Sequence, residues 1–307
     1  MTLMTNTDAA RSDIYQRVTD QIVAMIEAGA GKYEMPWYRA AGIPMNAISR
    51  KPYRGINTIM LWASAQVAGY PFDIWATFKQ WKEIGANVRK GERATSIVFW
   101  KISDLKDKED GDAEDAAGQE QHRSRAFAKG YAVFNAAQVD GYNPPVIPLL
   151  PAAERLAHAE TFFAGLNADV RHGGTKACYV PSRDQIMMPE FEVFRSGVAY
   201  YSTLAHEVTH WTGHEKRCAR DLRSRFGDEA YAAEEMVAEL GAAFLAADLD
   251  LTPEPRPDHA GYIASWLKAL KNDKRAIFTA AGKAQAAVDW MHACQANAGR
   301  MEDQAAA

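Results

Sequence analysis

The sequence contains few cysteines, no long apolar run and no sign of a signal peptide. Its three cysteines, Cys178, Cys218 and Cys294, are far apart and odd in number, which is not the pattern of a disulfide framework or a cysteine-type zinc site. No apolar stretch approaches the roughly 20 residues of a membrane span, and the polar N-terminal residues lack an apolar signal-peptide core. These absences favour a protein of the reducing cytoplasm with no membrane partner, and they argue against a secreted protease.

A large excess of acidic charge is also absent. The net charge is only −4 over 307 residues, whereas a protein that imitates DNA to decoy nucleases needs a strongly acidic surface. The remaining composition, 48% hydrophobic and 24% charged, is that of an ordinary globular protein long enough for two domains.

The charge that is present is unevenly distributed. Between residues 28 and 101, basic residues outnumber acidic ones by about seven, and aromatic residues are interleaved with them. Positive charge follows a phosphate backbone and exposed rings stack on bases, which is how a single strand is held without sequence readout. The alternative is that most of the rings belong to the core and the lysines form a solvated face. The predicted DNA contacts lie in two stretches that we expect to border one groove: Arg50, Lys51, Tyr53, Arg54 and Asn57, and then Lys79, Arg89, Lys90 and Arg93.

Hydrophobic periodicity predicts an α+β protein of two domains, the second mostly helical with a small sheet. We expect an N-terminal α+β domain over residues 1–143, a semi-rigid proline linker over 144–151 and a second domain over 152–307. Residues 104–122 are acidic, lack periodicity and are predicted to be a disordered insertion in the first domain. Predicted helices cover 12–28, 57–69, 75–84, 152–167, 199–213, 231–248 and much of 257–301, and predicted strands cover 94–102, 127–135, 170–172, 177–180 and 185–188.

The strongest motif is H-E-x-x-H, formed by His206, Glu207 and His210. On a helix, two histidines four residues apart lie within about 40° of arc and can reach one ion. The adjacent glutamate is then placed to act as the general base of a zinc-dependent hydrolase. An apolar stripe flanks the motif and Gly213 follows as a stop signal, so the segment is expected to be helical. The ion is predicted to be zinc, with manganese or another divalent ion as alternatives.

A catalytic zinc site needs a third protein ligand and keeps one position open. The segment YAAEEMVAELGAAFL supplies Glu234, Glu235 and Glu239 on a helix that is otherwise rich in small apolar residues. Carboxylates on a buried face are costly unless they are paired or bind a cation. Glu235 and Glu239 are four apart and share a face, so we predict Glu235 as the third ligand and Glu239 as the group behind it that orients a ligand histidine. The exchanged assignment stays open.

Two blocks of sequence resemble a known family. The segments PWYRAAGIPMNAISRKPYRGINTIMLW, ATFKQWKEIGANVRKGERATSIVFWK and FAKGYAVFNAAQVDG resemble the N-terminal domain of the ArdC antirestriction family, which includes the N-terminal region of TraC-type plasmid primases. The segments LAHEVTHWTGHEKRC and YAAEEMVAELGAAFL resemble the zincin-type metallopeptidase domain that follows it in that family.

The resemblance implies a single-stranded DNA-binding domain followed by a gluzincin-like domain, carried on mobile elements such as conjugative plasmids. It implies that the motif histidines are metal ligands, that Glu207 is the general base and that an acidic third ligand lies near Glu235. The sequence departs from the better-known gluzincins in one respect, because their N-E-x-x-x-D signature appears here as Glu234, Glu235 and then Glu239.

The function expected from this resemblance is protection of incoming mobile-element DNA from host restriction, with a host protein as a candidate peptidase substrate. The alternative is a strand-coating or primase-associated binding protein whose metal is structural and which cuts no peptide bond.

Overall fold

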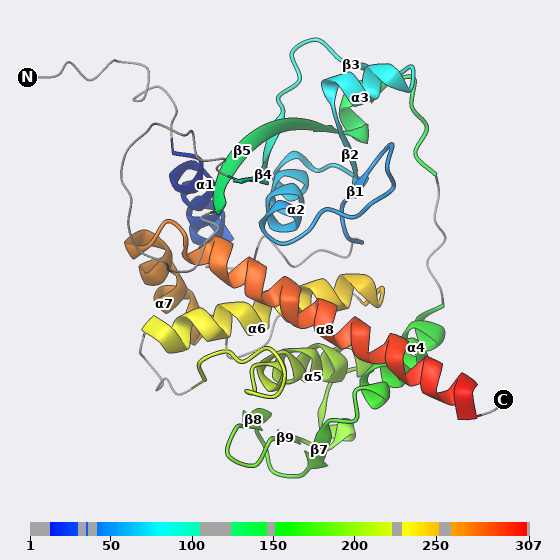
Figure 1. Ribbon diagram of the computed structural model, residues 1–307, viewed down its shortest axis with the longest axis vertical. Coiled ribbons are helices and arrows are strands. Elements are labelled where there is room, and N and C mark those ends of the chain that lie inside the picture. Colours follow the sequence, from blue (N-terminus) through cyan, green and yellow to red (C-terminus); the bar gives the residue numbers. More distant parts are fainter. Residues whose placement is uncertain are drawn as a thin grey trace, which may run out of the picture.

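The computed structural model describes residues 13–29, 35, 42–104, 124–145, 151–222, 229–251 and 259–305. Nearly all of the predicted acidic insertion at 104–122, and most of the predicted linker at 144–151, lie outside these ranges. As predicted, the described residues form an N-terminal α+β part and a mostly helical C-terminal part (Figure 1). None of the helices in these ranges is long and apolar enough to cross a bilayer.

The N-terminal part combines three α-helices with strands of 2 to 12 residues. Its elements are α1 (Ile14–Gly29), β1 (Met45–Asn46), α2 (Ile56–Ala68), β2 (Ile74–Thr77), α3 (Phe78–Glu83), β3 (Asn87–Val88), β4 (Thr95–Asp104), β5 (Ser124–Asn135), the 3-10 helix η2 (Ala136–Gln138) and β6 (Val139–Asp140). The main sheet has the order β1-β2-β5-β4, and β4 and β5 form its long antiparallel ribbon, in which Thr95 lies opposite Val133. The helix α2 packs on β4, where the Asn57 amide bonds both the N–H and the carbonyl of Val98.

One predicted helix is wrong at its start. The sequence favours a helix over 75–84, but Trp75 belongs to β2 and α3 begins only at Phe78. Thr77 ends the strand and caps the helix, because its hydroxyl accepts the N–H of Gln80 while the Gln80 side chain accepts the N–H of Thr77. The strand runs directly into the helix with no glycine or proline between them, so this capping pair is the only local signal of the boundary.

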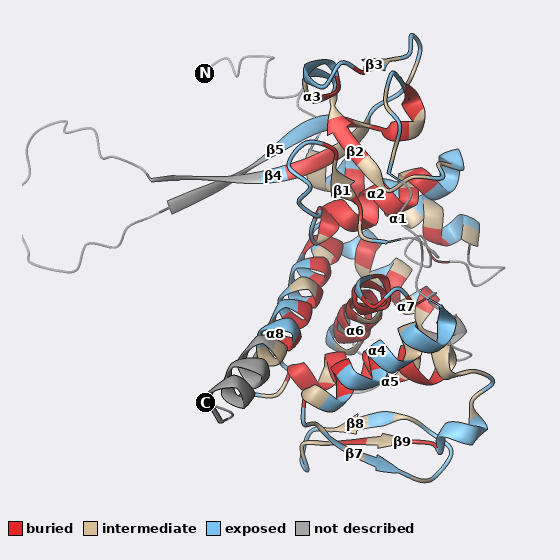
Figure 2. Cartoon of the chain, turned by 90° about the vertical axis from the view of Figure 1, so that its right-hand side faces the viewer, coloured by how far each residue is buried: buried red, intermediate tan, exposed pale blue. Residues whose placement is uncertain are grey.

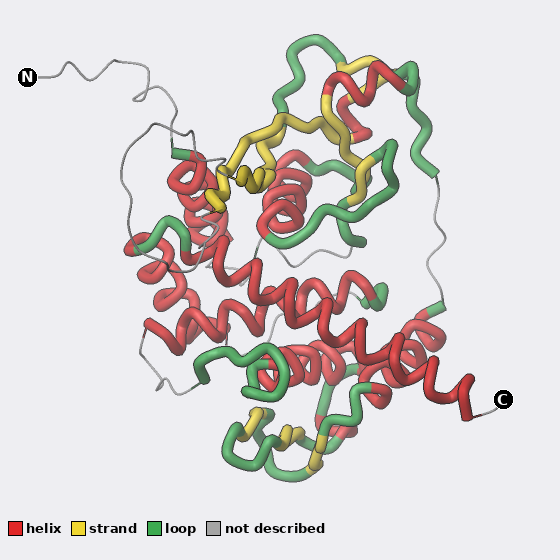
Figure 3. The backbone as a smooth tube through the Cα atoms, viewed as in Figure 1, coloured by secondary structure: helices red, strands yellow, loops and turns green. Residues whose placement is uncertain are grey.

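The C-terminal part consists of helices and one small sheet. Its elements are α4 (Ala152–Gly165), β7 (Asp169–His172), β8 (Cys178–Val180), β9 (Gln185–Met188), the 3-10 helix η3 (Phe191–Val193), α5 (Gly197–Thr212), α6 (Glu229–Asp248), α7 (His259–Asn272) and α8 (Ala276–Ala305). The three-stranded sheet has the order β7-β9-β8. The predicted elements of this part are confirmed to within a few residues, and α5 ends directly before the predicted stop at Gly213. Figure 3 shows its helices in red and the strands of its small sheet in yellow.

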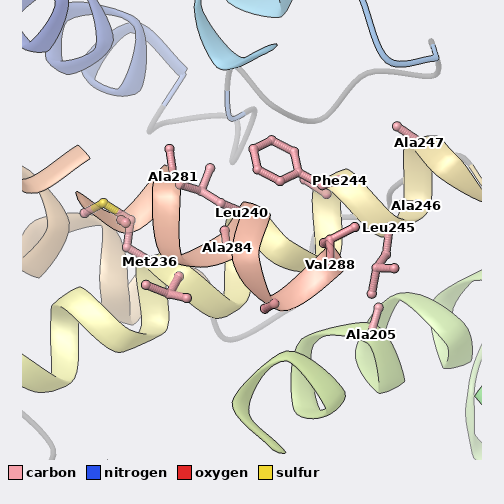
Figure 4. Close-up of a cluster of buried hydrophobic side chains, with 14 of the residues drawn as sticks. Ala205, Met236, Leu240, Phe244, Leu245, Ala246, Ala247, Ala281, Ala284 and Val288 are labelled. Carbon is pink, nitrogen blue, oxygen red and sulfur yellow. The ribbon is translucent and has the colours of Figure 1, made fainter. Parts of the chain in front are cut away.

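The helix α6 packs against both α5 and α8 (Figure 4). Its side chains Met236, Leu240, Phe244 and Leu245 are almost fully buried. Phe244 also reaches the N-terminal part, where its ring centroid lies 5.8 Å from that of Trp62 in α2. A continuous apolar core therefore joins helices of both parts, and Figure 2 shows the buried residues along α6 and α8.

Candidate metal centre

The H-E-x-x-H segment lies on α5, whose two ends are fixed by local contacts. Ser196 caps the start by accepting the N–H of Ala199 at 3.0 Å. At the other end, the N–H of Gly213 bonds the carbonyl of His210, and a Cβ on Gly213 would lie only 2.9 Å from that carbonyl oxygen. The side chains of His206 and Glu207 are buried, so the motif lies on the side of α5 that faces the rest of the protein.

Three donor atoms from α5 and α6 converge. The Nε2 atoms of His206 and His210 lie 3.1 Å apart. Oε2 of Glu235 lies 3.3 Å from the first of these nitrogens, and Oε1 of the same carboxylate lies 3.5 Å from the second. Donors arranged tetrahedrally at the usual zinc–ligand distances of about 2.0–2.1 Å lie about 3.3 Å from one another. The spacing of these nitrogens and carboxylate oxygens therefore fits a divalent metal held by His206, His210 and Glu235.

The other ring nitrogen of each histidine faces a carboxylate. Nδ1 of His210 lies 3.2 Å from Glu234, and Nδ1 of His206 lies 3.5 Å from Glu239. The second contact is longer than a normal hydrogen bond, and His206 Nδ1 makes no hydrogen bond within the described residues. Carboxylates in this position typically orient metal-binding imidazoles. The arrangement leaves both Nε2 atoms directed at the centre.

Buried charge dominates the electrostatics of the centre. Arg220 forms an ion pair with Glu234, and both side chains are almost fully buried. Burial disfavours the charged form of His210, but hydrogen bonds to Glu234 and Glu235 outweigh it and raise the pKa of His210 to about 10. Burial likewise favours neutral Glu235, yet hydrogen bonds from His206 and His210 hold the pKa of its carboxyl well below the usual range. The carboxylates thus attract positive charge to this point.

Glu207 lies in a cleft of about 290 Å³ that the three donor residues also line. Its carboxylate accepts the N–H of Tyr179 in β8 at 2.9 Å. Because β8 is an edge strand of the small sheet, this bond fixes the wall of the cleft against α5. Glu207 is therefore anchored beside the two imidazoles with its carboxylate at the cleft surface.

Two tyrosines complete the cleft. Tyr231 of α6 and Tyr262 of α7 line it, with their hydroxyl oxygens 3.3 Å apart. Burial, then hydrogen bonding to Tyr262 and the charge of Glu235, raise the pKa of Tyr231 far above its ordinary value. The Tyr231 hydroxyl is protonated at neutral pH and can donate to an oxyanion that forms in the cleft.

Two of the predicted DNA contacts are buried and hold the fold together. The Tyr53 hydroxyl accepts from the Asn46 amide at 3.1 Å, and its ring belongs to a small core cluster with Trp75. Asn57 is occupied by its two bonds to β4. Neither side chain projects from the surface as the predicted cations do, because packing of the helix α2 on the sheet uses both of them, but each lines a pocket between α2, β4 and α8.

The seven remaining predicted contacts are exposed cations. Arg50 and Lys51 lie in the turn after β1. A hydrogen bond of 3.2 Å from the Asn46 amide of β1 to Gln80 of α3 holds this turn near Lys79. Arg54 pairs with Asp289 of α8. The others follow β3: Arg89 bonds Glu92 and the Ala137 carbonyl, and Lys90 and Arg93 flank it in the same turn. A single groove shared by both stretches stays a prediction.

Sequence reasoning missed several residues of the centre. Glu234 was a candidate ligand, but it faces the outer nitrogen of His210 instead of the centre. Arg220 and Tyr179 come from an irregular segment and a short strand, and no periodic pattern predicts where such side chains lie. His214, four residues after His210, lies beyond the helix end and accepts the N–H of Lys216.

Two family models match the chain. Residues 12–134 match the N-terminal domain of the anti-restriction factor ArdC, and residues 157–283 match a zincin-like metallopeptidase. The C-terminal part is therefore a zincin-like domain, and the donor geometry described above lies inside it.

Solved structures of similar proteins cover nearly the whole chain. The metal-free crystal structure of the antirestriction ArdC protein from plasmid R388 superposes with a TM-score of 0.77 at 40% identity, covering 93% of this chain and 99% of that one. Its Mn(II)-bound structure gives a TM-score of 0.74 over the same shares. The chain belongs to the ArdC antirestriction family, as the sequence predicted.

Curated relatives are of two kinds. The uncharacterized protein y4eC of Sinorhizobium fredii is 54% identical over 96% of this chain and 97% of its own length. A DNA primase TraC of Escherichia coli is 36% identical over 92% of this chain, and a second is 35% identical over the same share. The chain spans only 27% and 20% of these primases.

Proposed function

We propose that the protein binds single-stranded DNA in the cytoplasm and protects incoming mobile-element DNA from host restriction, while its zincin-like domain holds a catalytic divalent metal. Family membership supports the antirestriction role. The exposed cations around the turn after β1, α3 and β3 support the nucleic-acid role, because they give the N-terminal part a positive surface.

The observation that carries the metal proposal is the convergence of the two Nε2 atoms and the Glu235 carboxylate at 3.1 to 3.5 Å. In this proposal His206, His210 and Glu235 are the ligands, and Glu234 and Glu239 orient the imidazoles. We propose zinc as the ion, because nitrogen and carboxylate donors at tetrahedral spacing suit it, while the same donors accept manganese. The relative from plasmid R388 has a Mn(II)-bound form.

The cleft supports hydrolysis of a peptide bond as the chemistry. A divalent ion held there supplies Lewis acidity toward a carbonyl and makes water more acidic. Glu207, held at the cleft surface by the Tyr179 N–H, accepts the proton of the attacking water and passes it to the amine that leaves when the C–N bond breaks. Tyr231, which stays protonated, stabilises negative charge on the carbonyl oxygen. The proposed substrate is a host protein.

The experiment measures metal content and affinity for a dT oligonucleotide in wild type and His206→Ala. One equivalent of metal in wild type, lost in the variant while DNA binding survives, supports both halves of the proposal. Wild type that binds no divalent metal refutes the metal half, and wild type that binds no single strand refutes the DNA half. A restriction-protection assay in cells then tests the biological role.

A second function is a strand-coating protein with a structural metal. The Tyr179–Glu207 hydrogen bond favours this second function, because it gives the Glu207 carboxylate a structural role that needs no catalysis. Glu207→Gln separates the two cases, with cleavage of fluorescent casein as the readout. Loss of cleavage by roughly 100-fold or more, with metal retained, indicates a catalytic base. Absence of cleavage in metal-loaded wild type favours the binding protein.

A further inference from the structure

The β4–β5 ribbon carries an exposed aromatic pair. Phe99 and Tyr131 expose 50% and 40% of their surface, and their rings meet edge to face with centroids 5.3 Å apart. They share one face of the ribbon, because Phe99 lies opposite Lys129 and Tyr131 lies opposite Ile97, two positions away on the same strand. Adjacent large rings on a strand face leave contiguous apolar surface in water, and binding sites commonly have such surface.

A cation accompanies the rings. Nζ of Lys129 lies 5.2 Å from the centroid of the Tyr131 ring, within the range of a cation–π contact. Side chains that offer a ring to a base and an ammonium group to a phosphate are the combination with which proteins hold single strands. The ribbon thus offers single-stranded nucleic acid both stacking surface and positive charge.

A pocket of about 490 Å³ opens beside Phe99, between the ribbon, the chain that enters α2, and α8. Phe278 gives it an apolar wall, and Arg54, Gln285 and Asp289 give it polar groups. The Arg54–Asp289 pair is about half exposed, and exposed ion pairs contribute little, so Arg54 can exchange its carboxylate partner for a phosphate at small cost.

We propose that this face, made of Phe99, Lys129, Tyr131 and the adjoining pocket, holds single-stranded DNA by stacking. Bases lie on the two rings, one base enters the pocket beside Phe99, and Lys129 and Arg54 contact the flanking phosphates. A duplex does not fit this role, because its bases stack on one another and do not reach the rings. The inference rests on the proposed single-strand binding and assigns it to elements other than α3 and the β3–β4 turn.

The test compares the full-length, metal-loaded protein with Phe99→Ala, Tyr131→Ala and the double variant, using fluorescence anisotropy of a dT oligonucleotide. Loss of one stacked base weakens binding by roughly 5- to 150-fold, so the double variant is expected to lose more than tenfold. Tyr131→Phe keeps the ring and should bind like wild type. Phe191→Ala removes an aromatic ring of comparable exposure on η3 and should also leave the affinity unchanged.

Photo-cross-linking provides a readout that does not depend on affinity. An oligonucleotide carrying 5-iodouracil should form adducts on peptides that contain Phe99 or Tyr131. Wild-type affinity in the double variant, with adducts elsewhere, overturns this assignment and leaves the proposed function intact. Absence of single-strand binding in wild type overturns both. A stronger preference for RNA or for a duplex of the same sequence overturns the choice of single-stranded DNA as the occupant.

Discussion

At the residue scale, neighbouring carboxylates have different positions around the centre. Glu234 and Glu235 are adjacent in sequence, yet Glu235 faces the Nε2 atoms and Glu234 faces the outer nitrogen of His210. This is possible because His210 points between the two side chains, one nitrogen toward each. Glu239, one turn further along α6, takes the corresponding outer position at His206.

These positions predict graded effects on metal affinity. Glu235→Gln removes an anionic ligand and should abolish stoichiometric binding, whereas Glu234→Gln and Glu239→Gln should each weaken binding by about 10- to 100-fold, since they only orient a histidine. Chelator competition with Zn²⁺ measures all three. Glu190→Gln, at an exposed site outside the cleft, serves as the matched control. If Glu239→Gln abolished metal binding and Glu235→Gln retained it, the ligand and the orienting group would have to be exchanged.

The sequence predicts the inner residues of this centre better than the outer ones. His206, Glu207 and His210 share a helix, so helical geometry alone brings them together. Placing Glu235 requires only that a second amphipathic helix face the first. Arg220 lies in a segment without regular structure, and its pairing with Glu234 depends on tertiary packing that no local pattern records.

At the element scale, the close approach of α5 and α6 sets the distances within the centre. Gly241 of α6 permits it: a Cβ there would lie 2.5 Å from Cγ2 of Thr209. Thr209 cannot turn aside easily, because its hydroxyl bonds the Ala205 carbonyl inside a buried face. The helix pair is therefore spaced by a glycine close to the proposed metal ligands.

Gly241→Ala is expected to lower stability by about 1–3 kcal/mol through overpacking, and to weaken metal binding because it moves α6 away from α5. Thermal unfolding and metal titration check the two effects. Gly282→Ala is the control, because a Cβ on this α8 glycine meets nothing within 4 Å. That substitution should be neutral or stabilising by up to about 1 kcal/mol. Equal behaviour of the two variants would remove the argument for a glycine spacer.

A contact between α8 and α6 predicts that the folding stability depends on pH. The Asp248 carboxylate lies 3.1 Å from Nε2 of His292 and raises the pKa of that imidazole, against the effect of burial. A raised pKa in the folded state stabilises the protein fully below the unfolded value of about 6.5, and the effect is lost as pH rises through the folded value. Both groups are partly exposed, so the effect is at most about 1 kcal/mol. Asp248→Asn should therefore be less stable than wild type at pH 5.5 and equal to it at pH 9, by urea unfolding.

The element scale also shows where pattern reasoning works. Helix α1 buries an apolar stripe at helical spacing, formed by Val18, Ile22 and Ile26, and the limits of α5 follow from the Ser196 cap and from Gly213. The boundary between β2 and α3 does not follow from such a pattern. Both elements contribute a buried tryptophan, and the chain passes from one to the other without a break. The four-stranded order of the main sheet depends on pairings between segments far apart in sequence, which periodicity does not specify.

At the scale of the whole molecule, the two parts are not independent bodies. Buried residues of α1 and α2 belong to the same apolar cluster as those of α5, α6 and α8. The Trp62–Phe244 contact and the packing of α8 on α2 cross between the parts. Stability gained at the metal centre should therefore extend to the strands that we propose to hold DNA, since exposing one side of a shared core exposes the other.

This coupling predicts that metal stabilises both parts together. At a free Zn²⁺ concentration 100 times the dissociation constant, binding adds about 2.7 kcal/mol to the folded state. Hydrogen exchange in moderate urea should then slow by a similar factor in α5 and in the β4–β5 ribbon, because both open in one cooperative step. His206→Ala controls for non-specific effects of zinc and should show no change in either region. Slower exchange confined to α5 and α6 would mean that the shared core opens in two steps and that the parts respond to the metal separately.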